Sequence, residues 1–289
     1  MKSLSAVLLL SVLPVAAFAT PTPFVIDKDH KGQLTIEQFE GSNSDGGRFE
    51  VLLPSGKTQE LGGFEFIDDG KNPGASFTDF NFDGYNDIAI DVPVGMVNFE
   101  TFIYLWQPEA GQFKALKPNN PGACGQFSDV TLDEKNKTII SSCRGGPVWY
   151  SDKFKYDDQG KLYLASDMEL NMGVAPDHDI STFAFFERYY DPQGKKISQQ
   201  AIGIEGEPYV YTVKNEKLRL YNAPNKAQKS AMYLVKGDQV AIVDLTVLEN
   251  TDKTWVKIKY ASKKRGDIYK WVAADETEHS APQESAVFR

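Results

Sequence analysis

Residues 79–87, DFNFDGYND, run directly into the apolar residues 88–94, IAIDVPV. Oxygen-bearing side chains recur at alternate positions of the first segment, and Gly84 supplies the freedom that a reversing backbone needs. Hard oxygen donors without sulfur or imidazole favour calcium over zinc. An EF-hand loop would carry glutamate at its twelfth position and continue as a helix, but here that position is Ile90 and an apolar run follows. The sequence therefore predicts a calcium loop that feeds a β-strand.

The predicted ligands are four side chains and one main-chain carbonyl: Asp79, Asn81, Asp83, the carbonyl of Tyr85, and Asp87. The alternative is a polar turn between strands that binds no metal. In the calcium interpretation the ion is structural and takes no part in catalysis.

Short apolar or alternating runs recur between residues 49 and 165, bounded by Gly, Pro, Asn and Asp clusters: 49–53, 88–92, 102–106, 130–132, 138–142 and 162–165. This rhythm predicts an all-β fold with antiparallel strands, in a propeller-like or sandwich-like domain. Residues 156–161, YDDQGK, and 190–195, YDPQGK, resemble each other and are typical hairpin turns, with glycine where a positive φ is needed.

Residues 1–19 combine Lys2, an apolar stretch and the small-residue ending Ala17-Phe18-Ala19, which is typical of a cleaved secretory signal. We therefore expect an exported protein, periplasmic or secreted, without a transmembrane segment; the alternative is an uncleaved anchor.

The two cysteines, Cys124 and Cys143, bracket a predicted hairpin with its turn at residues 133–137. An oxidising compartment and this placement predict a disulfide, which leaves no free thiol.

Acidic and basic residues are distributed unevenly along the chain. Residues 20–206 carry 16 basic and 29 acidic side chains, whereas residues 207–275 carry 13 basic and 8 acidic ones. We expect an acidic calcium-binding β domain at 20–206, a second domain at 207–275 and a disordered tail at 276–289. Surfaces of opposite sign suggest two different partners, and the acidic part argues against nucleic acid.

Four landmarks in the second domain resemble the bacterial SH3 family: KLRLYNAP at 217–224, LVKGDQV at 234–240, WVKI at 255–258 and KWV at 270–272. Lys270 stands where that family has a glycine. The resemblance implies a small SH3-like barrel that binds peptidoglycan or a peptide. The residues alone also favour a small barrel of about five alternating strands.

The sequence contains no clear group of catalytic residues. The three histidines, His30, His178 and His279, lie in polar segments without metal-ligand spacing, and are interpreted as solvated loop residues. Glu187 lies among aromatic residues, where a carboxyl group could have a raised pKa, but the preferred interpretation is that it faces solvent from a strand. Residues 27–38 begin like a second calcium loop, but Lys31 occupies a ligand position, so we predict an ordinary turn there. We therefore expect no enzyme; a hydrolase with an unrecognised carboxylate pair is the alternative.

After the second cysteine, the segment 143–150, CRGGPVWY, places an arginine and two aromatic residues beside a glycine turn. Rigid aromatic side chains and a forked cation dominate binding hot spots, so Arg144, Trp149 and Tyr150 are candidate protein-contact residues. The alternative is that the two aromatic residues fill a core, and strand alternation favours one on each side.

The calcium loop with its DIAIDV strand, the hairpin after Cys124 and the Arg-Gly aromatic segment together resemble a family of exported bacterial β-proteins. That family includes periplasmic lysozyme inhibitors and immunity proteins against secreted peptidoglycan hydrolases. The resemblance covers roughly residues 62–158 and implies a non-enzymatic protein that binds a lysozyme-like peptidoglycan hydrolase. The acidic domain would attract such a basic enzyme. The rival hypothesis is a cell-wall-binding or scaffold protein that acts through its SH3-like domain.

Overall fold

The computed structural model describes residues 20–39, 45–66, 71–171, 179–248 and 253–277. It is an all-β structure of antiparallel sheets, and the chain divides into two compact units, residues 1–117 and 118–289. The predicted signal segment, most of the predicted tail, His178 and His279 lie outside the described residues. Among the described residues, no helix has the length and apolar character needed to cross a membrane.

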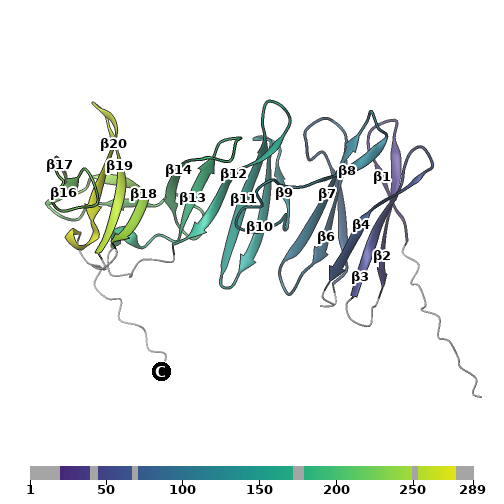
Figure 1. Ribbon diagram of the computed structural model, residues 1–289, viewed down its shortest axis with the longest axis horizontal. Helices are drawn as coiled ribbons and strands as arrows, with labels where there is room; N and C mark the ends of the chain where they lie inside the picture. The colour runs from purple at the N-terminus through teal and green to yellow at the C-terminus, as the bar shows by residue number, and fades with distance from the viewer. Residues whose placement is uncertain (1–19, 40–44, 67–70, 172–178, 249–252, 278–289) are drawn as a thin grey trace, which may run out of the picture. The chain divides into compact units, whose positions relative to one another are not determined.

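Unit 1 contains two four-stranded antiparallel sheets (Figure 1). The first has the order β1 (Thr22–Val25), β2 (Lys31–Phe39), β3 (Asp45–Leu52) and β4 (Thr58–Phe66). The second has the order β5 (Gly74–Thr78), β6 (Asp87–Pro93), β7 (Phe99–Gln107) and β8 (Gln112–Leu116).

Both sheets of unit 1 contribute to one hydrophobic core. Leu34, Phe49 and Val51 from the first sheet belong to the same buried cluster as Ile88 and Ile90 from the second. Five of the seven residues of β6 are apolar, as suits the second strand of its sheet, which is buried along most of its length. The predicted strand after the calcium loop is therefore confirmed.

Unit 2 contains two six-stranded sheets. The first has the order β14-β13-β12-β11-β10-β9, formed by β9 (Thr131–Asp133), β10 (Thr138–Gly145), β11 (Val148–Tyr156), β12 (Leu162–Leu170), β13 (Phe185–Tyr190) and β14 (Lys196–Ile202). The second has the order β15-β18-β19-β20-β16-β17, formed by β15 (Val210–Thr212), β16 (Lys217–Tyr221), β17 (Lys229–Val235), β18 (Gln239–Leu248), β19 (Lys253–Ser262) and β20 (Gly266–Ala273). The described residues of unit 2 also form two short 3-10 helices, η1 (Asp179–Ser181) and η2 (Ala274–Glu276).

The two similar turns predicted at residues 156–161 and 190–195 form hairpins. They join β11 to β12 and β13 to β14, and Gly160 and Gly194 adopt φ angles of 73° and 82°. An aspartate at the start of each turn, Asp157 or Asp191, accepts main-chain hydrogen bonds across it. The repeated sequence therefore encodes the same local geometry twice.

The expected barrel is not closed. In the part of the chain that the structure describes, β15 and β17 lie at the two ends of the last sheet and no strand pairing joins them. The predicted boundary at residues 206 and 207 falls inside unit 2, where Phe186 and Ala201 belong to one buried cluster with Leu220, Val256 and Val272. Residues on both sides of that boundary therefore share a core.

Candidate functional site

The predicted calcium loop lies in unit 1 between β5 and β6. Asp79 accepts main-chain hydrogen bonds from Asp83 (3.0 Å) and Gly84 (2.7 Å), and Asp83 accepts one from Tyr85 (3.0 Å). Gly84 has a φ of 96°, a conformation that a side chain would strain. The Nδ2 atom of Asn81 donates to Asp83 (2.8 Å). The main-chain amides of the loop therefore donate to carboxylates of the same loop, and the side chains of Asp79, Asn81 and Asp83 lie in one turn.

Asp87 occupies the end of this loop but is fully buried. Its Oδ2 accepts the amide of Phe80 (2.8 Å) and its Oδ1 accepts the amide of Trp106 (2.8 Å), so it ties the loop to β7. Burial, the largest cause, and the negative charges of Asp83 and Asp79 together raise the pKa of Asp87 to about 7, against the effect of the two amides. Each carboxylate oxygen has a second lone pair, so two amide bonds do not exhaust its capacity as a ligand.

The fit of this loop to a metal is therefore partial. Within the described ranges, no three His, Cys, Asp or Glu side chains converge as a metal-binding group. A calcium loop, however, also draws on amide and main-chain oxygens, which Asn81 and Tyr85 carry here. The donor set is chemically suited to calcium, with Asp87 placed deeper than the other side chains.

Residues 27–30 form a turn next to this loop. Asp27 accepts main-chain bonds from Asp29 and His30 (both 2.7 Å) and a third from the His30 ring (2.9 Å). The hydrogen bond with His30 is the main reason that the pKa of Asp27 is lowered. The turn covers residues 27–30 and β2 begins directly after it at Lys31, while the Ile26 carbonyl before the turn accepts the amide of Asn86 (2.8 Å).

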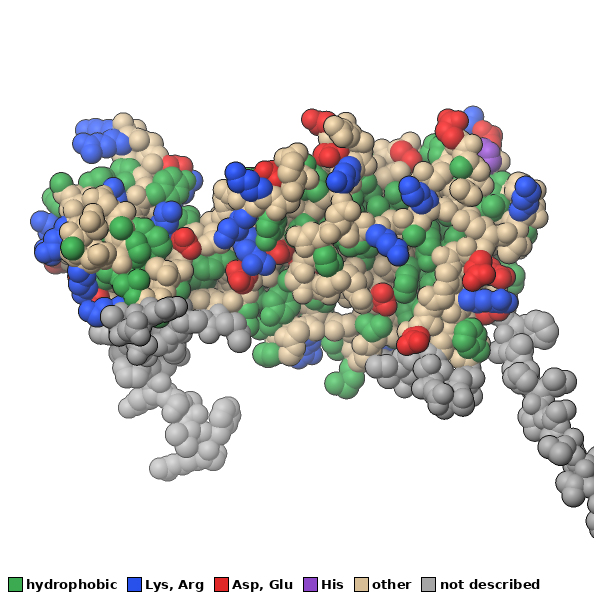
Figure 2. Space-filling view, viewed as in Figure 1, with side chains coloured by type: hydrophobic (Ala, Val, Ile, Leu, Met, Phe, Trp, Pro, Cys, Tyr) green, Lys and Arg blue, Asp and Glu red, His purple; other side chains and the backbone are tan. Residues whose placement is uncertain are grey.

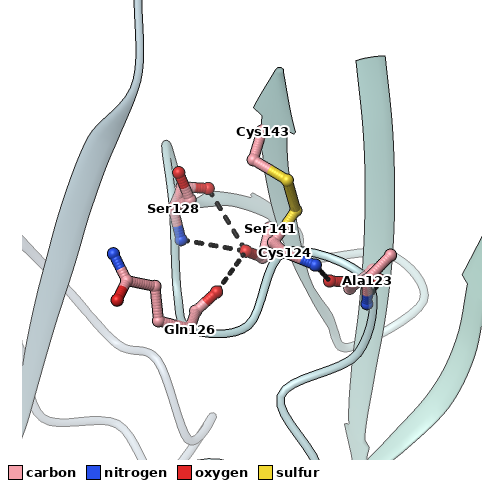
Figure 3. The surroundings of a disulfide bond; sticks show 7 residues. Ala123, Cys124, Gln126, Ser128, Ser141 and Cys143 are labelled. Atoms are coloured by element: carbon pink, nitrogen blue, oxygen red, sulfur yellow. Dashed lines mark hydrogen bonds between the residues drawn. A yellow bond between two sulfur atoms is a disulfide. The ribbon is translucent and has the colours of Figure 1, made fainter. Parts of the chain in front are cut away.

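The cysteines of unit 2 form the predicted disulfide (Figure 3). The sulfur atoms of Cys124 and Cys143 are 2.10 Å apart, so the bond links the segment before β9 to β10. Ser141 stabilises the same segment, since its hydroxyl accepts the amide of Ser128 (2.9 Å). The predicted hairpin is present as β9 and β10.

Asp152 is a buried anchor of the disulfide that sequence reasoning missed. Its two carboxylate oxygens accept the amides of Ala123 and Cys124 (both 2.9 Å). Burial raises the pKa of Asp152 to about 6, although both amides and the nearby Arg188 favour its charged form. The sequence holds no signal for this contact, because 28 residues separate the two partners of the Cys124 bond.

Arg144, Trp149 and Tyr150 lie at the hairpin that joins β10 to β11. Arg144 pairs with Trp149 across the strands, and Trp149 is 50% exposed. Tyr150 pairs with Cys143 and packs edge-on against the buried ring of Phe185, with 5.9 Å between ring centroids. Trp149 is thus available for contacts, whereas Tyr150 also supports the fold.

A depression of about 380 Å³ lies beside Trp149. Its apolar lining includes Trp149, Tyr150, Met168 and Ile204, of which Ile204 is 73% exposed. Its charged lining residues are Lys153, Glu187 and Glu205. The full lining is Ser142, Trp149, Tyr150, Ser151, Lys153, Met168, Glu187, Ile202, Ile204, Glu205 and Gly206. Exposed aromatic and aliphatic side chains around a small concavity are characteristic of protein-contact sites.

The preferred interpretation of Glu187 was wrong. Its side chain does not face solvent: it is 7% exposed and accepts hydrogen bonds from Lys153 (2.8 Å), Tyr189 (2.6 Å) and Ser166 (3.1 Å). Burial acts to raise the pKa of Glu187, but these three donors outweigh it and lower the pKa below its usual value. Glu187 is therefore a charged, fully paired group and not a protonated general acid.

Three comparisons, with protein-family models, with curated proteins and with solved structures, found no match to this chain.

Proposed function

We propose that this chain is an exported, non-enzymatic binding protein, periplasmic or secreted, that inhibits a lysozyme-like peptidoglycan hydrolase and is stabilised by calcium. The observation that carries the proposal is the pair of Arg144 and the half-exposed Trp149 beside the apolar-lined depression of unit 2. A rigid indole and a guanidinium held opposite each other on paired strands suit a partner's concave surface such as a substrate cleft.

The rigidity of this site supports the proposal. The disulfide fixes β10 directly next to Arg144, and Asp152 in β11 holds the other end of the disulfide segment through two amides. A partner therefore meets a surface that is ordered before binding, which lowers the entropic cost of association. The acidic residues of 20–206 would steer the chain toward a basic enzyme.

For calcium we propose the ligands Asp79, Asn81, Asp83, Tyr85 through its carbonyl, and Asp87. A bound cation would offset the mutual repulsion of the three carboxylates, which contributes to the raised pKa of Asp87. It would also brace the entry to β6, the strand whose apolar side chains belong to the core of unit 1. The role is structural.

We also propose that the two sheets of unit 1 form a sandwich-like fold and that residues 207–275 form an SH3-like fold. The common core of the two four-stranded sheets supports the first, and the four sequence landmarks, which fall on β16 to β20, support the second.

The inhibitor function is tested by titrating the full chain against labelled peptidoglycan and a panel of basic lysozyme-type muramidases. We expect stoichiometric inhibition of at least one enzyme, with inhibition weakened at least tenfold by Trp149→Ala. Phe39→Ala, which removes a 55%-exposed aromatic side chain from unit 1, is the matched control and should inhibit like the wild type. No inhibition across the panel, or equal weakening by both variants, would count against the proposal.

The second candidate is a cell-wall-binding or scaffold protein that acts through residues 207–275, favoured by a lysine-lined groove to which this segment contributes β18 and β19. Sedimentation of the full chain with purified peptidoglycan separates the two functions. Strong sedimentation without any effect on muramidase activity would favour this candidate.

A further inference from the structure

Unit 2 has an open groove of about 1260 Å³, lined by residues distant in sequence from Arg144 and Trp149. It is lined by β14 on one side and by β18 and β19 on the other, with contributions from β15 and β20. A side-chain hydrogen bond joins β14 to β18 at this place, from Gln199 to Asp244 (3.1 Å). The two sheets that border the groove pack β14 against β18 and share a core, but no strand pairing joins them in the described chain.

A free strand edge borders this groove. β14 is the last strand of its sheet, paired only with β13. Ala201 turns its carbonyl away from β13 to accept the amide of Tyr209 (2.9 Å), and main-chain groups two residues apart in a strand point to the same side. Gln199 therefore presents its amide and carbonyl to the groove, where neither has a main-chain partner in the described chain.

The opposite side of the groove is also incompletely paired. β18 extends from Gln239 to Leu248, but β15 covers only Gln239 to Ala241. An unpaired edge is a template for a further strand, and an added strand gains affinity from main-chain hydrogen bonds.

The charged side chains that line the groove determine which kind of added strand would fit. Four lysines and two aspartates line it: Lys196, Lys257, Lys259 and Lys263 against Asp238 and Asp244. Both aspartates are engaged within the fold, Asp238 with the amide of Val235 (2.9 Å) and Asp244 with Gln199. Lys259 pairs with Asp267 (2.8 Å), but Lys257 and Lys263 form no ion pair with a described residue. Figure 2 shows Lys and Arg side chains spaced over the surface of the part of unit 2 that contains β16 to β20.

Apolar side chains accompany the lysines. Ile197 is 63% exposed, and Val210 and Tyr269 are each 49% exposed. An extended strand places alternate side chains on opposite sides, so carboxylates on one side could meet the lysines while apolar side chains on the other meet these residues.

We propose that this groove binds an acidic, extended peptide segment of a partner protein as an added strand along the edge of β14. Main-chain bonds to Gln199 supply the register, and Lys257 and Lys263 supply the selectivity for acidic residues. This site is independent of the proposed inhibitor function, because neither Arg144 nor Trp149 lines the groove. The free edge favours a peptide over an anionic glycan, since a peptide main chain offers alternating donors and acceptors at the spacing of a strand.

The probe is a fluorescent octapeptide of alternating valine and glutamate, capped at both ends and titrated with the full chain at moderate ionic strength. Three further ligands define the mode of binding: the same peptide with alternate amides N-methylated, a valine–lysine octapeptide, and an alginate oligomer. We expect saturable binding of the valine–glutamate peptide, a loss of at least tenfold on N-methylation, and no binding of the lysine peptide. Equal binding of the methylated peptide or the alginate would overturn strand addition, because attraction to any polyanion would then suffice.

Variants locate the site. The double substitution Lys257→Gln with Lys263→Gln should weaken binding about tenfold, whereas Lys161→Gln with Lys229→Gln, which removes the same charge from residues outside the groove, should leave it unchanged. Gln199→Pro removes an edge amide that Gln199→Ala keeps, so only the proline variant should lose binding beyond the loss of the side chain. Circular dichroism verifies folding. Equal effects of the two lysine pairs, or wild-type binding by a folded Gln199→Pro variant, would contradict the assignment.

Discussion

The Nζ atom of Lys153 lies 2.8 Å from Oε1 of Glu187, and this ion pair joins two strands of one sheet that are not neighbours. Lys153 is in β11 and Glu187 in β13, so the bond passes over β12, where Ser166 donates to the same oxygen. Three strands are thus held together by one carboxylate.

Glu187→Ala should lower the free energy of unfolding by about 2 kcal/mol, because it removes charge-assisted hydrogen bonds and leaves Tyr189 and Ser166 without their acceptor. Lys153 is 43% exposed and can turn to water, so the cost stays below that of a fully buried pair. Urea denaturation measures the effect. Glu109→Ala, an exposed control, should change stability by less than about 0.5 kcal/mol. A change in Glu187→Ala as small as in the control would contradict the network.

Asp152 should make stability fall as pH rises. Its pKa is raised from 3.8 to about 6 in the folded protein, so the folded state binds a proton more tightly than the unfolded state. This contribution is fully present below about pH 4 and is lost between about pH 4 and 6, by about 3 kcal/mol at most. The pH profile of the Asp152→Asn variant, measured by urea denaturation, should lack this decline. An unchanged profile would place the titration on another group.

Reduction of the disulfide should destabilise unit 2. Cys124 and Cys143 are separated by 19 positions, and opening a loop of this size costs about 3 kcal/mol in the chain-entropy model. Cys124→Ser with Cys143→Ser should lower the melting temperature, and reducing agent should lower that of the wild type but not of the variant. A wild-type protein that melts identically with and without reductant would show that the bond contributes nothing to stability.

Calcium should raise the melting temperature, and a chelator should reverse the effect, because a ligand that binds only the folded state stabilises it by mass action. The expected gain is about 2.7 kcal/mol at a calcium concentration of 100 times the dissociation constant. Asp83→Asn should abolish the calcium response. Asp157→Asn alters another turn aspartate that accepts main-chain bonds, in unit 2, and should retain it. A melting temperature that is insensitive to calcium would contradict the proposal that calcium stabilises the protein.

Much of the fold could be predicted from local sequence. The strand at residues 88–92, the hairpin between the cysteines and the repeated turns depend on alternation and on glycine or aspartate at fixed positions. The exposure of Trp149 against the packing of Tyr150 also follows from strand alternation.

The position of Glu187 could not be predicted in this way. Its neighbours Phe185 and Phe186 are both buried, so β13 is covered on both faces and alternation no longer separates an inner from an outer side. In addition, a register shift at Lys153 and Phe154 sets which side chains of β11 and β12 lie opposite each other. Such a bulge leaves little trace in sequence. Asp152 was missed for a related reason, since its partners lie far along the chain.

The most direct test of the account is the rate at which a basic lysozyme-type muramidase releases fragments from labelled peptidoglycan as the full chain is added in increasing molar ratio, with calcium present. We expect the rate to fall toward zero near one molecule of chain per enzyme, and the chain alone to release nothing. A rate that stays constant at a large excess of chain for every muramidase tested, or fragments released by the chain itself, would contradict it.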